Sequence, residues 1–185
     1  MNSKQASYQP VTAYGARIDK KGEEWTLVLV RDLKHPPEKV WRAITEPEHL
    51  KEWAPFDADV SLATVGAKAK LTTIGAPPAY ATTETTVKRA EKNKALEYTW
   101  GGGDMRWELE SHGAGTRLTL WAIINKGFIA TGAAGWHVCF DVLDRLLADD
   151  PMGRLIAGDA LQHEGWHRLH AEYAQQFGVA MPKMR

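Results

Sequence analysis

The strongest constraint on the fold is a change of hydrophobic period near residue 130. From Asp59 to Asn125, short β-prone runs are separated by clusters of Gly, Pro, Asn and Asp, a pattern typical of about five strands in an antiparallel meander. Residues 132–148 instead repeat apolar side chains every three or four positions, which predicts one long helix with a broad apolar stripe. The chain therefore predicts an α+β fold in which a sheet with one apolar face packs against that helix.

The first fifty residues predict two strands followed by two short helices. Residues 23–34 are rich in β-branched and aromatic side chains, so we expect a strand there and a partner over about residues 8–18. Residues 35–37, His-Pro-Pro, end the strand because proline donates no backbone hydrogen bond, and a helix to about Thr45 follows. Residues 47–53 predict a second short helix.

The C-terminal part of the chain predicts one more helix. It spans about residues 160–177, and Gly178 is its expected C-terminal stop. Repeats and low-complexity linkers are absent from the sequence. We therefore expect a single domain over residues 8–178, between flexible termini at residues 1–7 and 179–185.

Composition narrows the range of functions. Lys plus Arg and Asp plus Glu both number 23, so no bulk charge favours nucleic acid as a partner. No run of about 18 apolar residues predicts a membrane span, and the polar N-terminus predicts a cytoplasmic protein without a signal peptide. Cys139 is the only cysteine, which excludes an intrachain disulfide and fits a reducing compartment.

Two segments resemble a known family. HPPEKVWRAITEPEHLKEWAPF, at residues 35–56, and GWHVCFDVLDRLL, at residues 135–147, are similar to segments of the heat-shock-protein-90 ATPase activator-like branch of the START-like, birch-pollen-allergen superfamily. The likeness spans roughly residues 14–178. It implies a helix-grip fold, in which a curved antiparallel sheet of about six to seven strands surrounds the long C-terminal helix. We expect no further domain before Tyr8, so chaperone activation is not implied.

The resemblance also implies a cavity between the sheet and the long helix, suited to a small apolar or amphipathic molecule. Large side chains on the facing elements either fill this space or line a pocket. Polar groups that could orient a bound molecule are Glu84 and Arg106, although Arg106 alternates with the apolar positions of its strand. The candidate ligand-binding residues are Trp53, Glu84, Tyr98, Trp100, Arg106, Trp107, Leu120, Trp136, Phe140 and Leu143.

His137 and Asp141 are the weak candidates for catalysis. They lie four positions apart on the predicted long helix, where the carboxylate can contact the imidazole and select its tautomer for acid-base chemistry. The alternative is a pair on the helix surface beside the apolar stripe.

Residues 163–167, His-Glu-Gly-Trp-His, match the HExxH pattern of zinc hydrolases. The longer metzincin spacing is absent, since His170 follows only three residues later, and Gly165 weakens the helix. We therefore expect no metal and no other cofactor, and treat His163, His167 and His170 as adventitious metal ligands at most.

Three hypotheses for function remain. The leading one is a binder of a small apolar or amphipathic molecule, with little or no catalysis. The second is an enzyme of the cyclase, dehydratase or hydrolase type acting inside the cavity. The third is a protein-interaction module, with a chaperone as one candidate partner. A homodimer is compatible with each of them, because twofold assemblies are common among domains of this size.

Overall fold

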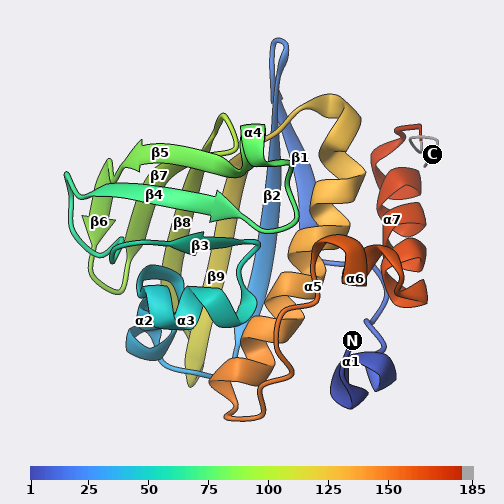
Figure 1. The fold of residues 1–185 in the computed structure, drawn as a ribbon, viewed down its shortest axis with the longest axis horizontal. Coiled ribbons are helices and arrows are strands. Elements are labelled where there is room, and N and C mark those ends of the chain that lie inside the picture. The colour runs from blue at the N-terminus through green and yellow to red at the C-terminus, as the bar shows by residue number, and fades with distance from the viewer. Residues whose placement is uncertain (181–185) are drawn as a thin grey trace.

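Two antiparallel sheets curve around one long helix, and further helices close the sides (Figure 1). The computed structural model of the chain describes residues 1–180. The helices are α1 (Ser3–Ser7), α2 (Pro37–Thr45), α3 (Pro47–Trp53), α4 (Pro78–Ala81), the 3₁₀ turn η1 (Lys126–Phe128), α5 (Ile129–Leu147), α6 (Ala157–Leu161) and α7 (Glu164–Phe177). The strands are β1 (Ala16–Lys21), β2 (Glu24–Leu33), β3 (Phe56–Ala58), β4 (Lys68–Thr73), β5 (Thr82–Thr86), β6 (Arg89–Glu91), β7 (Ala95–Trp100), β8 (Gly103–His112) and β9 (Gly115–Ile123).

The main sheet has six strands in the order β1-β2-β9-β8-β7-β6. Three shorter strands form a second sheet, β3-β4-β5. The hydroxyl of Thr85 on β5 accepts a hydrogen bond of 3.0 Å from the backbone N–H of Thr99 on β7, which ties the two sheets together. The helix-grip prediction is therefore confirmed, and the strands expected as one meander are divided between two sheets.

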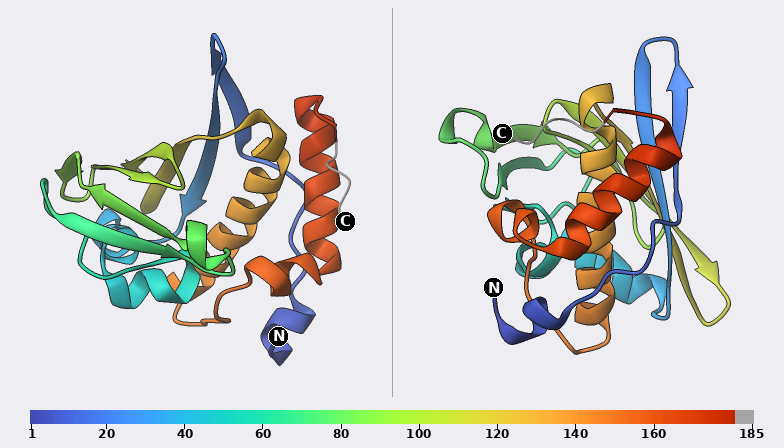
Figure 2. Two further views of the ribbon diagram at one scale, coloured as in Figure 1. Left: turned by 45° about the horizontal axis from the view of Figure 1, so that its top comes forward. Right: turned by 90° about the vertical axis from the view of Figure 1, so that its right-hand side faces the viewer.

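The first strand differs from the prediction, because β1 begins at Ala16 and not near Tyr8. The hairpin turns at Gly22, whose φ of 61° is a conformation that glycine adopts without strain. Residues 8–15 form no strand. They run alongside α5 and α7 (Figure 2), where the backbone N–H of Ala13 donates to the Glu172 carboxylate.

The N-terminal end contains a short helix where a flexible terminus was expected. Residues 3–7 form α1, whose Asn2 cap and Gln5 make a reciprocal capping box, and the Gln5 side chain donates to the carbonyl of Arg154. Of the expected C-terminal flexible segment, residues 181–185 lie outside the described residues.

The expected last helix is divided into α6 and α7. The helical conformation is interrupted at Gln162 and His163. The His163 side chain caps α7 by accepting a hydrogen bond of 3.1 Å from the Gly165 N–H. Gly178 ends α7 in the left-handed conformation, with φ of 62°, as its position predicted. None of the helices within residues 1–180 is long and apolar enough to cross a membrane.

Candidate functional site

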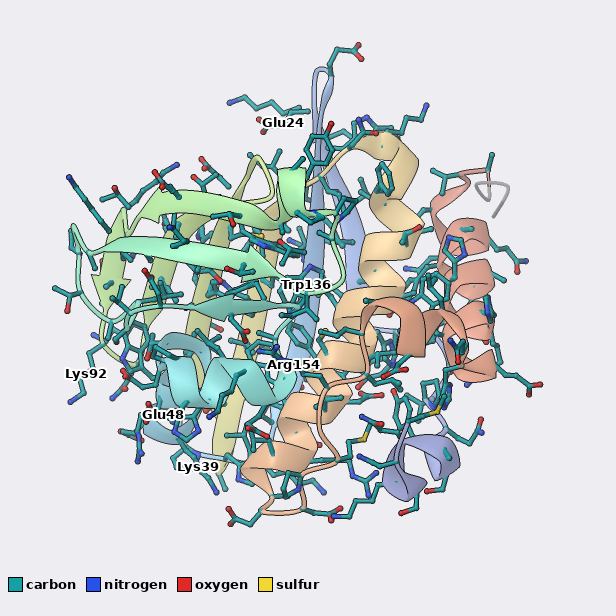
Figure 3. The ribbon with its side chains drawn as sticks, viewed as in Figure 1. Glu24, Lys39, Glu48, Lys92, Trp136 and Arg154 are labelled. Carbon is teal, nitrogen blue, oxygen red and sulfur yellow. The ribbon has the colours of Figure 1, made fainter. Side chains whose placement is uncertain are left out.

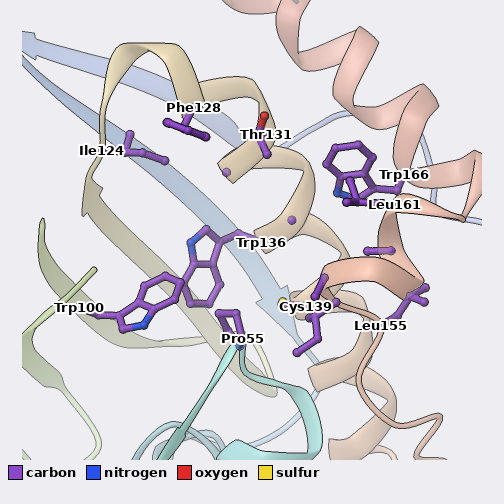
Figure 4. A pocket seen from close by; sticks show the side chains of 15 residues that line it. Pro55, Trp100, Ile124, Phe128, Thr131, Trp136, Cys139, Leu155, Leu161 and Trp166 are labelled. Carbon is purple, nitrogen blue, oxygen red and sulfur yellow. The ribbon is translucent and has the colours of Figure 1, made fainter. Parts of the chain in front are cut away.

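A cavity of about 380 Å³ lies beside the N-terminal half of α5 (Figure 4). The connection from β9 to α5 and the α6–α7 region contribute to its walls, Trp100 comes from the end of β7, and Pro55 comes from the turn before β3. Its volume falls within the range of small-molecule pockets. The lining residues are Pro55, Trp100, Ile124, Phe128, Thr131, Gly132, Gly135, Trp136, Cys139, Leu155, Ile156, Ala157, Ala160, Leu161 and Trp166.

The cavity exists because α5 presents small residues at this end. Gly132, Gly135, Trp136 and Cys139 follow the i, i+3, i+4, i+7 spacing of one helix face, and all four line the cavity. A Cβ added at Gly135 would meet no atom within 4 Å, whereas one at Gly132 would lie 2.5 Å from Cδ1 of Ile124. Gly135 therefore leaves open space, and Gly132 allows Ile124 to pack closely.

One wall of the cavity is the segment from Leu155 to Leu161, which contains α6. Arg154 fixes the start of this segment: its guanidinium pairs with Asp57 and donates to the carbonyls of Leu50, at 3.2 Å, and Phe56, at 3.3 Å. Figure 3 shows Arg154 directed toward α3. The start of the segment is thus attached to α3 and β3.

The lining is almost entirely apolar. Its polar atoms are the Thr131 hydroxyl, the Cys139 thiol and backbone or indole groups. Burial raises the pKa of the Cys139 thiol to about 12, so it remains protonated near neutral pH and does not act as a nucleophile. The Thr131 hydroxyl lies 3.3 Å from Nε2 of His170, a buried imidazole whose pKa is lowered by burial.

Apolar side chains also stand exposed at the rim. Phe128 is 64% exposed and Leu161 is 48% exposed, although both line the cavity. A second hollow, of about 540 Å³, adjoins the first and shares Trp100, Ile124, Phe128 and Trp136 with it. The cavity therefore opens through an apolar mouth beside the turn at residues 101–103.

Of the predicted ligand-binding residues, the structure places Trp100 and Trp136 on this cavity. The others that lie between sheet and helix pack against one another farther along α5. Trp53 and Trp107 meet edge to face at 6.1 Å between ring centroids, and the indole N–H of Trp107 donates to the Tyr98 hydroxyl at 3.1 Å. These core residues, each no more than 1% exposed, are Trp53, Tyr98, Trp107, Leu120, Phe140 and Leu143.

Glu84 and Arg106 do not reach the cavity, which corrects the prediction for both. They are exposed on the outer faces of their strands. Arg106 pairs with Glu108 and lies 4.5 Å from the Trp121 ring, because alternate residues of a strand point to opposite faces and Trp107 points inward.

His137 and Asp141 face away from the cavity, into a polar cluster on the opposite side of α5. Asp141 pairs with Arg31 and accepts a hydrogen bond of 2.5 Å from the Tyr8 hydroxyl. The Tyr173 hydroxyl donates to the Tyr14 carbonyl, so Nδ1 of His137, 2.8 Å away, is the donor to Tyr173.

This cluster binds the N-terminal segment and α7 to α5. His137 is fully buried, and burial lowers its pKa to about 4. Its other nitrogen, Nε2, lies 3.7 Å from the Asp141 carboxylate without a hydrogen-bond partner among the described residues. The pair is neither on the helix surface nor in the cavity, which gives a cavity reaction no acid-base pair at these positions.

The histidines of the HExxH pattern do not converge. His163 precedes α7 and caps it, His167 lies 2.7 Å from the Leu161 carbonyl, and His170 stacks on Trp166. Because the helix begins after His163, the two pattern histidines do not share a helix face. Within residues 1–180, no group of three His, Cys, Asp or Glu side chains is arranged to hold a metal ion.

Several cavity residues were missed from the sequence. Gly132 and Gly135 carried a readable signal, since small residues at helical spacing beside Trp136 indicate a hollow face. Trp166 and the segment 155–161 carried none, because their approach to α5 depends on how the chain returns after α5.

The curved sheet around α5, with an apolar cavity at one end, defines the helix-grip class of the START-like superfamily. The model of the family described as activator of Hsp90 ATPase homolog 1-like protein matches residues 34–148, more than half of the chain. The chain belongs to this family.

Solved structures agree with that fold. A conserved protein of unknown function from Enterococcus faecalis superposes with a TM-score of 0.65 at 17% identity, covering 87% of this chain and 89% of that one. CalU16 from Micromonospora echinospora gives 0.61 at 19% identity, over 91% and 96% of the two chains. A protein from Mesorhizobium loti gives 0.59 at 26% identity, over 69% and 99%. No curated protein sequence matches the chain.

Proposed function

We propose that this protein binds a small, largely apolar molecule in the cavity beside α5. The observation that carries the proposal is the apolar cavity of about 380 Å³, whose walls include Trp100, Trp136 and Trp166. Aromatic walls bury ligand surface and match flat apolar molecules, while an apolar rim gives such molecules access. The family supports a fold of this binding type.

The polar groups of the cavity support binding without catalysis. Among the residues that the structure describes, the cavity lining contains no carboxylate and no imidazole, and its thiol is held protonated. General acid-base catalysis needs a group within hydrogen-bond reach of the reacting atom. The hypothesis of a chaperone partner rests on the family description alone.

The first experiment is native mass spectrometry of gently purified protein, followed by organic extraction. A defined added mass that is released by extraction supports the proposal and identifies the ligand class. Bare protein from several expression hosts, together with no binding of apolar dyes, would overturn it.

Two substitutions at Gly135 assign such binding to this cavity. Gly135→Leu places an isobutyl group in the open space, and we expect at least a tenfold loss of affinity with the fold retained. Gly135→Ala adds only a methyl group that meets no atom within 4 Å, so it is the matched control and should keep most of the affinity. Equal affinities for the two variants would place the ligand elsewhere.

A further inference from the structure

The walls of the cavity point to the shape of its ligand, provided that the proposed binding function holds. Trp100 and Trp136 stand almost perpendicular, with ring centroids 5.8 Å apart and planes at 78°. A flat ring in the corner between them can stack on one indole and present its edge to the other, the two arrangements that aromatic rings prefer. Trp166 is held against His170, with ring centroids 5.0 Å apart.

The lining supplies no charge to pair with an ionic ligand. None of the lining side chains within residues 1–180 is charged near neutral pH. The cations next to the lining are engaged elsewhere: Arg154 pairs with Asp57, and Lys126 lies with Nζ 5.2 Å from the Trp25 ring. His170 is kept neutral by burial, which lowers its pKa. Because an unpaired charge is costly to bury, an anionic ligand is disfavoured.

A free indole N–H lies on the Phe128 side of the mouth. Of the three indoles that line the cavity, Trp100 already donates, to the Thr73 hydroxyl at 2.9 Å, whereas within residues 1–180 the N–H groups of Trp136 and Trp166 make no such bond. Figure 4 shows the Trp136 nitrogen on the side of Ile124 and the exposed Phe128. A ligand acceptor at the mouth would satisfy it.

The volume limits the size of the molecule. An engineered apolar cavity of about 150 Å³ holds benzene, so a cavity of about 380 Å³ accepts roughly two to three rings. From shape, charge, donor and volume together, we infer that the ligand is an uncharged, flat molecule of two to three rings with one hydrogen-bond acceptor, which it directs to the Trp136 N–H.

The test uses matched pairs of probes on the intact protein. N-phenyl-1-naphthylamine and 1-anilinonaphthalene-8-sulfonate share one ring framework and differ by a sulfonate. We expect the neutral dye to bind at least tenfold more tightly, with binding lost in Gly135→Leu and kept in Gly135→Ala. In displacement assays, 2-acetylnaphthalene should bind about fivefold more tightly than 2-isopropenylnaphthalene, which has the same shape without the carbonyl acceptor.

The outcomes separate this inference from the function on which it rests. Equal or tighter binding of the sulfonate, abolished by Gly135→Leu, would overturn the inference and leave the binding function standing. Equal affinity of the two naphthalenes would remove the role of Trp136 in orienting the ligand. If none of the four probes binds and no molecule co-purifies with the protein, both proposals are overturned.

Discussion

One helix, α5, faces both halves of the space under the sheets, yet one half is filled by side chains and the other contains a cavity. Toward the C-terminal end, Phe140 packs against Trp53 and Trp107, Leu143 is buried in the same core, and none of the four is more than 1% exposed. Toward the N-terminal end, Gly132 and Gly135 leave a cavity of about 380 Å³. A curved sheet is wider than a single helix can fill, so side-chain size along α5 decides where space remains. Binding capacity and core stability are therefore carried by different residues of one element.

Removing a large side chain from the filled half should have the largest effect. Trp107→Ala deletes an indole that is 1% exposed and leaves the Tyr98 hydroxyl without its donor. We expect the free energy of unfolding to fall by about 3–5 kcal/mol, measured by urea denaturation. Trp121→Ala, on the outer face of β9 under Arg106, is the control and should cost about 1 kcal/mol or less. Similar losses for both would contradict the division into a filled interior and an outer face.

Acid should destabilise the protein without weakening ligand binding by the folded molecules. The His137 pKa is lowered to about 4 from its ordinary 6.5, so the unfolded chain takes up this proton first as the pH falls. The contribution of neutral His137 to the free energy of unfolding is fully present above about pH 6.5. It is lost as the pH falls from there to about 4, a total loss of about 3 kcal/mol. Urea denaturation across this range measures it, and His137→Gln should flatten the slope.

The affinity for N-phenyl-1-naphthylamine should stay constant from pH 8 to pH 6, because none of the described residues that line the cavity titrates in this range. An affinity that falls in step with stability would show that the polar cluster and the cavity are coupled across α5.

Single methyl groups added to the hollow half should have the smallest effects, and these should differ between two neighbouring glycines. Gly135→Ala gains helix propensity and meets open space, so we expect stabilisation of up to about 1 kcal/mol. Gly132→Ala gains the same propensity but places its Cβ 2.5 Å from Cδ1 of Ile124, the movable end of that side chain, and should be less stable than Gly135→Ala by about 1 kcal/mol or less. Thermal unfolding of the two variants measures the difference.

The sequence allowed most of the helix-grip framework to be predicted, because local chemistry marks its boundaries. Pro37 and Pro47 start α2 and α3, and Gly178 ends α7. Alternation along β8 correctly placed Trp107 inside, and the same rule puts Arg106 outside, so its candidacy for the cavity went against its own strand pattern.

The candidate site was less accessible to prediction, for a physical reason. Whether a large side chain lines a cavity or fills the core depends on which residues face it in the folded chain. The sequence does not distinguish Trp53, which fills the core, from Trp136, which lines the cavity. The His137–Asp141 spacing gave their proximity but not the direction they face, since Tyr8 and Arg31 approach from distant parts of the chain. The break before α7 likewise depends on a cap that His163 makes with its own side chain.

The contact between Gly75 and Ala157 has a consequence for how wide the cavity can be. Both residues have positive φ, 77° and 51°, and a Cβ on Gly75 would lie 2.4 Å from the Cβ of Ala157. The loop after β4 can pack this closely against α6 only because residue 75 has no Cβ. A side chain at residue 75 would be strained by the positive φ and would press on Ala157, so the width of the cavity depends on a loop that contributes no lining residue.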